Sequence, residues 1–80
     1  MRIPRDLSGR ELAQKLGVFG YALTRQTGSH ARLSTMQNGE HHVTIPMHDE
    51  LRLGTLNAII SDVARHFDIS KSEIADKLFG

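Results

Sequence analysis

Apolar residues near the start of the chain recur at helical spacing, which predicts a helix over about residues 9–19. The residues of this stripe are Leu12, Leu16 and Phe19. Ser8 followed three positions later by Glu11 has the spacing of a capping box, which favours a helix start at this point. Gly20 is suited to the C-terminal cap, whereas Gly17 is a weak point that could end the helix earlier.

The next part of the chain lacks a helical stripe and carries aromatic, β-branched and alternating apolar residues, which predicts strands. We expect them over Tyr21–Gln26, Ser29–Met36 and His41–Ile45. Thr27-Gly28 and Asn38-Gly39 are turn signals, because glycine and asparagine tolerate a positive φ. Pro46 closes the third strand. Such short turns predict an antiparallel meander.

Helical spacing returns in the last third of the chain, with Thr55 as a plausible N-cap of a longer helix. Its continuous apolar stripe consists of Leu56, Ile59, Ile60, Val63 and Phe67. A second capping-box spacing, Ser70 to Glu73, predicts a short final helix in which Ile74 and Leu78 face inward.

The predicted order is α-β-β-β-α plus a short C-terminal helix, which makes an α+β fold within a single domain spanning residues 1–80. Two amphipathic helices are enough to cover one face of a three-stranded antiparallel sheet, and nothing is left to cover the other. We therefore expect all helices on one face and the second face open to solvent or to a partner.

The two-residue period of a strand predicts which side chains stand on the open face. Residues that mark the core side are Ala31, Leu33, Val43 and Ile45. The neighbouring positions then point outward, and they are His30, Arg32, Ser34, His42 and Thr44. His41 falls on the core side, near the end of the sheet. An imidazole and a guanidinium on an uncovered sheet are the first indication of a site.

Composition narrows the classes of protein that this chain can represent. Eighty residues with 39% hydrophobic and 24% charged side chains fit one small globular domain, whose active site must be shallow. The absence of cysteine excludes disulfides, thiolate zinc sites and thiol nucleophiles. No apolar run approaches the roughly 20 residues of a membrane-spanning helix. The start of the chain shows no hydrophobic signal region, so we expect a cytoplasmic protein.

The charge of the chain is small but unevenly distributed. The net charge is +1, yet residues 1–48 carry six basic and three acidic side chains, whereas residues 49–80 carry four basic and six acidic ones. Four of the five histidines also lie between positions 30 and 48. A polyanionic partner is therefore expected to meet the first part of the chain.

Several other sites are disfavoured by the residues themselves. His41 and His42 are adjacent on a strand and point to opposite faces, so they cannot hold one metal ion together. Ser29 and His30 diverge for the same reason and make a poor nucleophile pair. The spacing of Ala64, Ile69 and Ile74 resembles a helix-turn-helix, but core packing of a helical hairpin explains it better. A single exposed histidine such as His30 is, taken alone, weak evidence for catalysis.

A resemblance to a known family makes His30 a stronger candidate for a catalytic residue. The segments that carry it are Ile3-Pro4-Arg5-Asp6-Leu7-Ser8-Gly9, Gly20-Tyr21, Arg25-Gln26-Thr27-Gly28-Ser29-His30, His42-Val43-Thr44-Ile45-Pro46, Leu53-Gly54-Thr55-Leu56 and Ile59-Ile60. In this order and without a large gap, they resemble the HicA family, also called YcfA-like. The combination is specific, although no single segment is.

The resemblance implies a toxin of a toxin-antitoxin pair, a small ribonuclease that cleaves messenger RNA, with a fold similar to the double-stranded-RNA-binding domain. It also implies that the histidine of Gly-Ser-His, His30 here, is the catalytic residue. The implied partner is a HicB antitoxin, which blocks the active face and supplies the operator-binding domain. DNA would then be contacted only through the antitoxin, and no membrane is involved.

RNA carries its own nucleophile, the 2′-hydroxyl group, so acid-base help and charge stabilisation are sufficient and neither a metal nor another cofactor is required. We expect His30 to act as the acid or base and Arg25 or Arg32 to pair with the phosphate. Ser29 and His42 complete the predicted RNA-binding set, and strand parity makes His42 the nearest candidate for a second proton-transfer group. A non-catalytic RNA-binding module and a protein-interaction domain remain the alternatives.

Overall fold

Three antiparallel strands form one sheet in the order β1-β2-β3 in the computed structural model, which describes residues 2–80. The strands are β1 (Ala22–Thr27), β2 (His30–Thr35) and β3 (His41–Pro46). The turn after β2 has positive φ at Asn38 (57°) and Gly39 (97°), and the turn before it has φ 58° at Gly28. The predicted meander and both turns are therefore confirmed, with no strand end shifted by more than one residue.

The predicted first helix is divided into two types of helix. It runs as the α-helix α1 (Gly9–Lys15) and continues as the 3₁₀ helix η1 (Leu16–Phe19) up to Gly20, whose φ of 81° terminates it. The capping box at its start is complete, because the Ser8 side chain accepts from the Glu11 N–H and the Glu11 carboxylate accepts from the Ser8 N–H. The change of helix type immediately precedes Gly17, the predicted weak point.

The long helix, α2 (Leu53–Phe67), begins earlier than predicted, so the assignment of Thr55 as its N-cap is wrong. Arg52 occupies the N-cap without a side-chain hydrogen bond. Leu51 is only 5% exposed, and its N–H donates to the Leu7 carbonyl at 2.8 Å. Burial of Leu51 and its backbone bond fix where the chain enters the helix, and this tertiary anchor overrides the local preference for a threonine cap.

The final helix, α3 (Lys71–Phe79), begins where predicted, with the Ser70 side chain accepting from the Glu73 N–H. Ala64 of α2 and Ile74 of α3 are buried in the common core. Their burial accounts for the spacing that resembled a helix-turn-helix. No helix within residues 2–80 is long and apolar enough to cross a membrane.

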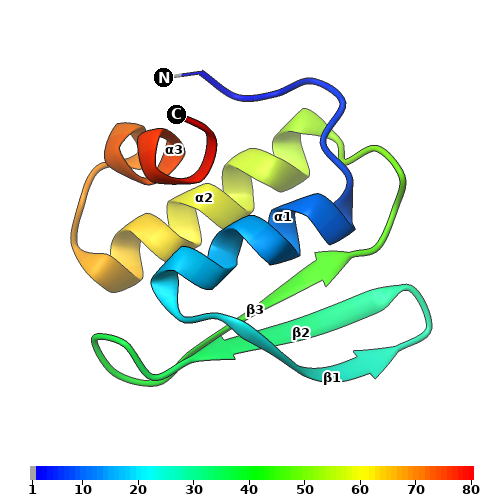
Figure 1. The fold of residues 1–80 in the computed structure, drawn as a ribbon, viewed down its shortest axis with the longest axis horizontal. Coiled ribbons are helices and arrows are strands. Elements are labelled where there is room, and N and C mark those ends of the chain that lie inside the picture. The colour runs from blue at the N-terminus through cyan, green and yellow to red at the C-terminus, as the bar shows by residue number, and fades with distance from the viewer. Residues whose placement is uncertain (1) are drawn as a thin grey trace.

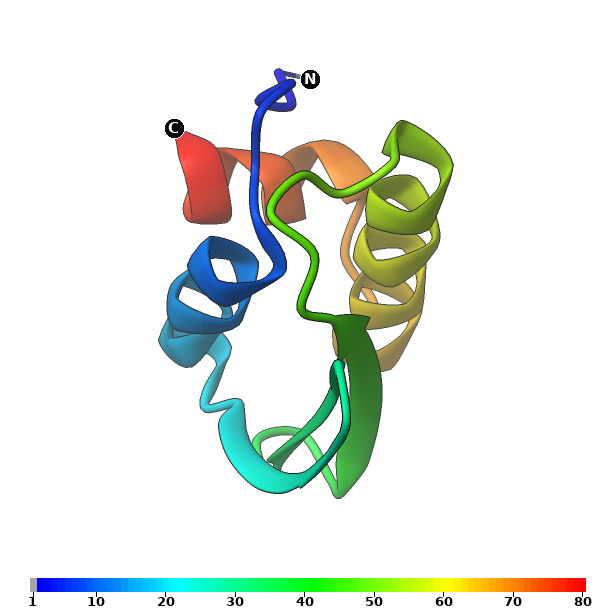
Figure 2. The ribbon, with the colours of Figure 1, turned by 90° about the vertical axis from the view of Figure 1, so that its right-hand side faces the viewer.

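The helices form one layer and the sheet forms another, as Figures 1 and 2 show from two directions. The side chains of β2 and β3 alternate between buried and accessible, and the buried set is the predicted one: Ala31, Leu33, Val43 and Ile45. The α+β fold with one open sheet face is confirmed. In addition, β1 is exposed along its whole length, and even Leu23, which pairs with Leu33, is 56% exposed.

Candidate functional site

Strand register divides the open face of the sheet into three rows of side chains. In the first row His30 of β2 lies between Thr27 of β1 and Pro46 of β3. In the second, Arg32 lies between Arg25 and Thr44, and in the third, Ser34 lies between Ala22 and His42. Because directly paired residues of an antiparallel sheet share a face, each row brings its three side chains to the same side.

His30 begins β2 directly after the turn at Gly28 and Ser29, and its side chain is exposed. Its ring makes no hydrogen bond within residues 2–80. Both ring nitrogens are therefore available to a ligand as donor or acceptor. The prediction that this imidazole stands on the uncovered side of the sheet is confirmed by its position.

The middle row holds Arg25 and Arg32 directly opposite each other, and both side chains are exposed. Like charges in this arrangement are destabilising unless an anion lies between or above them. No carboxylate forms an ion pair with either guanidinium in the part of the chain that the structure describes. Arg32 is two residues from His30 on one strand face, about 7 Å along the strand. The two rows can therefore contact one phosphodiester group together.

Ser29 lies at the same end of the sheet as His30 and is exposed. Its carbonyl accepts the Met47 N–H at 2.5 Å, which joins the β1–β2 turn to the chain that leaves β3. His48, an exposed residue, directly follows Met47, and its carbonyl accepts the Gly9 N–H at 3.0 Å. His48 has no predicted role, because it follows the strand-ending Pro46 and the two-residue period of a strand does not extend to it.

His42 lies on the open face as predicted, but at the far end of it from His30. It pairs with Ser34, which is four residues from His30, a separation of about 13 Å along β2. The expectation that His42 is the nearest second proton-transfer group is therefore wrong in position. The side chain instead belongs to a polar chain in which its Nδ1 contacts Ser34 Oγ at 2.5 Å and its Nε2 contacts Glu40 Oε2 at 2.7 Å.

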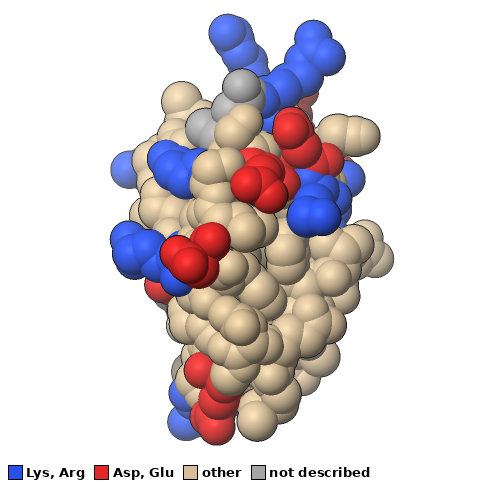
Figure 3. All heavy atoms as spheres, turned by 90° about the vertical axis from the view of Figure 1, so that its left-hand side faces the viewer, with Lys and Arg blue, Asp and Glu red and all other residues tan. Residues whose placement is uncertain are grey.

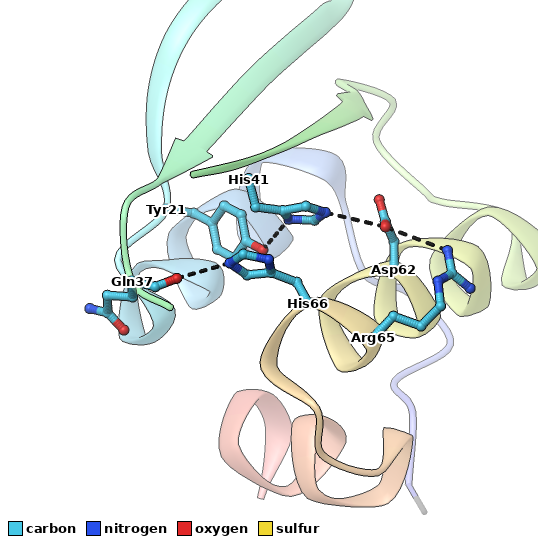
Figure 4. Close-up of polar contacts among 6 residues, drawn as sticks. All are labelled: Tyr21, Gln37, His41, Asp62, Arg65 and His66. Atoms are coloured by element: carbon cyan, nitrogen blue, oxygen red, sulfur yellow. Dashed lines mark hydrogen bonds and ion pairs between the residues drawn. The ribbon is translucent and has the colours of Figure 1, made fainter. Parts of the chain in front are cut away.

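A second group of histidines lies on the helix side of the sheet (Figure 4). His41 Nδ1 contacts the Tyr21 hydroxyl at 2.7 Å, and its Nε2 contacts Asp62 Oδ1 of α2 at 3.2 Å. The His66 ring stacks on His41 with centroids 4.4 Å apart, and its Nε2–H donates to the Gln37 carbonyl at 2.9 Å. Burial, aided by the Asp62 carboxylate, raises the pKa of Tyr21 to about 12. These side chains join α2 to the sheet.

Charge is distributed unevenly over the surface as well. Figure 3 views the end of the molecule that carries η1 and the β2–β3 turn, and a broad area in its lower right shows no charged side chains, whereas acidic and basic side chains line its lower left edge. Two exposed apolar residues belong to these segments, Val18 (63% exposed) and Met36 (73%). Charged side chains are therefore gathered on parts of this surface rather than spread evenly over it.

Comparison with known proteins supports the resemblance noted in the sequence. No curated protein and no solved structure matches this chain. Residues 9–64 match the family described as the HicA toxin of bacterial toxin-antitoxin systems. The match covers more than half of the chain, from α1 to near the end of α2, and includes all three strands with His30. This chain belongs to the HicA toxin family of bacterial toxin-antitoxin systems.

Proposed function

We propose that this toxin is a metal-independent endoribonuclease that cleaves messenger RNA on the open face of its sheet, with His30 as the catalytic acid or base. The observation that carries the proposal is an exposed imidazole without a protein partner within residues 2–80, next to a pair of arginines without carboxylate partners. RNase-type activity is the activity for which HicA toxins are known, which supports the same assignment.

The proposed reaction uses the 2′-hydroxyl of the substrate as nucleophile. Its oxygen forms a bond to the adjacent phosphorus, the bond from phosphorus to the 5′-oxygen of the next nucleotide breaks, and a 2′,3′-cyclic phosphate and a 5′-hydroxyl end result. The proton leaves the 2′-hydroxyl and another reaches the 5′-oxygen. His30 performs one of these transfers, and each transfer contributes typically about 10² to 10⁴ in rate.

Arg25 and Arg32 stabilise the negative charge that develops on the phosphate oxygens. Guanidinium groups present fixed donors to phosphate, and the two arginines start without a carboxylate to displace within residues 2–80. We expect Ser29, at the turn beside His30, to contact the RNA backbone as well. We propose His48, which lies just beyond Pro46 at the His30 end of the sheet, as the second proton-transfer group in place of His42.

Membership of the family implies an antitoxin partner. We propose that a HicB-type antitoxin covers the open face, because a single bound protein there would shield His30 and the arginine row together. A non-catalytic RNA-binding domain and a protein-interaction domain would use the same face, and they differ from the proposal only in leaving RNA intact.

The test is incubation of the purified protein with a defined single-stranded RNA in the presence of EDTA, followed by analysis of the ends. We expect cleavage that yields 2′,3′-cyclic phosphate ends, and no cleavage where the scissile 2′-hydroxyl is replaced by hydrogen. His30→Ala should leave the RNA intact, whereas Lys77→Ala, which alters an exposed cation on α3, should cleave normally. An active His30→Ala protein, or a requirement for a divalent cation, would reject the mechanism.

A further inference from the structure

The row of side chains at the far end of the open face differs chemically from the His30 end. There His42 is held on both sides, by Ser34 at Nδ1 and by Glu40 at Nε2. Ser34 Oγ is in turn 3.0 Å from Thr24 Oγ1, and Thr24 donates to the Arg32 carbonyl at 3.2 Å. Thr24 reaches this chain because β1 is irregular between Leu23 and Arg25. An imidazole whose two nitrogens are both engaged keeps one orientation.

The fixed ring is suited to bind rather than to transfer protons. The order carboxylate, imidazole, hydroxyl also occurs in serine hydrolases, where oriented backbone N–H groups beside the hydroxyl complete the site. Ser34 lies in β2, the central strand, which is bonded to neighbours on both sides. Its surrounding backbone N–H groups therefore belong to the sheet. The His42 ring, 34% exposed, instead offers a flat surface that can stack on a nucleobase.

Glu40 determines what can lie against that ring. Its side chain is 62% exposed, and only Oε2 is engaged by His42 within residues 2–80, so Oε1 remains an acceptor. A carboxylate repels a phosphate but accepts from the exocyclic amino group of a base. Cytosine, adenine and guanine each carry an exocyclic amino group and uracil carries none, so the same acceptor disfavours uracil.

We propose that Ser34, His42 and Glu40 form a nucleobase-reading subsite that selects an amino-bearing base, cytosine, adenine or guanine, over uracil. The subsite rests on the proposed function, because it takes RNA as the ligand of the open face. The roughly 13 Å from His30 to the Ser34 row places the selected base at one fixed distance from the scissile phosphate rather than at the cleaved bond. His30 and the arginines recognise the backbone, which is common to all sequences, and this subsite supplies the sequence preference.

The test selects sequences with a protein that binds but does not cut. His30→Ala protein is mixed with a pool of single-stranded RNA of random sequence, and bound molecules are sequenced. We expect cytosine, adenine and guanine to exceed uracil roughly fivefold at one position, the ratio that corresponds to about 1 kcal/mol for one specific contact. Adding Glu40→Gln should abolish this preference, because glutamine preserves a hydrogen bond to His42 but removes the charge. Adding Glu50→Gln, a matched exposed acid outside the sheet, should leave it unchanged.

Ser34→Ala in the same background should weaken the preference, because it frees one side of the ring. A pool without base preference at any position, or a preference that survives both Glu40→Gln and Ser34→Ala, would overturn the subsite. Cleavage by the wild-type protein tests the proposed nuclease activity separately from the subsite. If wild-type protein cleaves but the pool shows no preference, the nuclease stands without the subsite; if the pool shows the preference and wild-type protein does not cleave, the subsite stands without the nuclease.

Discussion

His30 and His41 stand on opposite faces of the same three-stranded sheet and show two different uses of one side chain. His30 is exposed, and no residue among 2–80 hydrogen-bonds to its ring. His41 is 19% exposed, and both its ring nitrogens are engaged, by Tyr21 and by Asp62 (Figure 4). Chain position does not separate them, since both begin a strand. The alternation of side chains along each strand distinguishes them, because the His30 ring points toward solvent and the His41 ring points toward the helices.

The difference between the two rings affects both the stability of the fold and the activity. A partly buried ring with satisfied nitrogens contributes to stability and has no capacity left for a substrate. An exposed ring without partners contributes little to stability and keeps that capacity. The two residues therefore make opposite predictions for activity and for unfolding, and substitution at each position separates the two quantities.

The largest expected effect is on catalysis. His30→Ala should lower the rate of RNA cleavage at least about 10²-fold, because it removes a proton-transfer group. The melting temperature should remain that of the wild type, since the ring is exposed and makes no hydrogen bond within residues 2–80. Single-turnover cleavage and thermal unfolding of the same sample measure both. A clear loss of stability in His30→Ala would mean that the ring has a structural role and would erase the contrast with His41.

The next largest effect is on stability. His41→Ala leaves the hydroxyl of Tyr21, a residue 4% exposed, without its partner, which costs about 1–3 kcal/mol. For a domain of this size each kcal/mol lowers the melting temperature by roughly 4–8 °C. Adding Tyr21→Phe should recover part of the loss, because the unpaired hydroxyl is removed. Below the unfolding transition, His41→Ala should still cleave RNA at the wild-type rate; a large loss of rate there would place His41 in the active site.

Alkaline pH provides a third way to distinguish the two sides of the sheet. The pKa of Tyr21 is raised to about 12 in the folded protein, from its ordinary value of 10. The unfolded chain therefore loses this proton first, and the free energy of unfolding should fall as the pH rises from about 10 to 12. Chemical denaturation at several pH values measures the slope. Tyr21→Phe should flatten this slope and His30→Ala should not change it. A wild-type slope equal to that of Tyr21→Phe would contradict the burial of the hydroxyl.

Local sequence signals predicted most of the fold but little of the detailed site geometry. The capping box at Ser8, the turn glycines and the alternation along β2 act through neighbouring residues, and all appear in the structure as predicted. The start of α2 depends on Leu51 meeting Leu7, a contact between distant parts of the chain, and was predicted wrongly.

The face occupied by each site residue was predictable, whereas its position along the face was not. Parity placed His30, Arg32 and His42 on the open side, but which residues lie opposite one another depends on register, which includes an irregularity between Leu23 and Arg25. Register brings Arg25 against Arg32 and moves His42 away from His30. The position of His48 follows from a backbone bond between Met47 and Ser29, for which the sequence carries no pattern.

The smallest expected effect concerns the arginine row. Substitution there should weaken RNA binding while leaving the stability of the fold unchanged or slightly higher. Arg25→Gln and Arg32→Gln should each weaken RNA binding and reduce the slope of log affinity against log salt by roughly one, because each guanidinium that neutralises a phosphate releases counterions. Stability should stay the same or rise slightly, since the substitution relieves a like-charge pair across the strands. Arg52→Gln, an exposed cation at the start of α2, is the charge-matched control and should leave the slope unchanged. Titrations of His30→Ala protein with RNA at several salt concentrations measure the slope without cleavage. Equal slopes for Arg25→Gln, Arg52→Gln and the parent protein would show that phosphates do not approach the middle row, and the route of RNA over the sheet would have to avoid it.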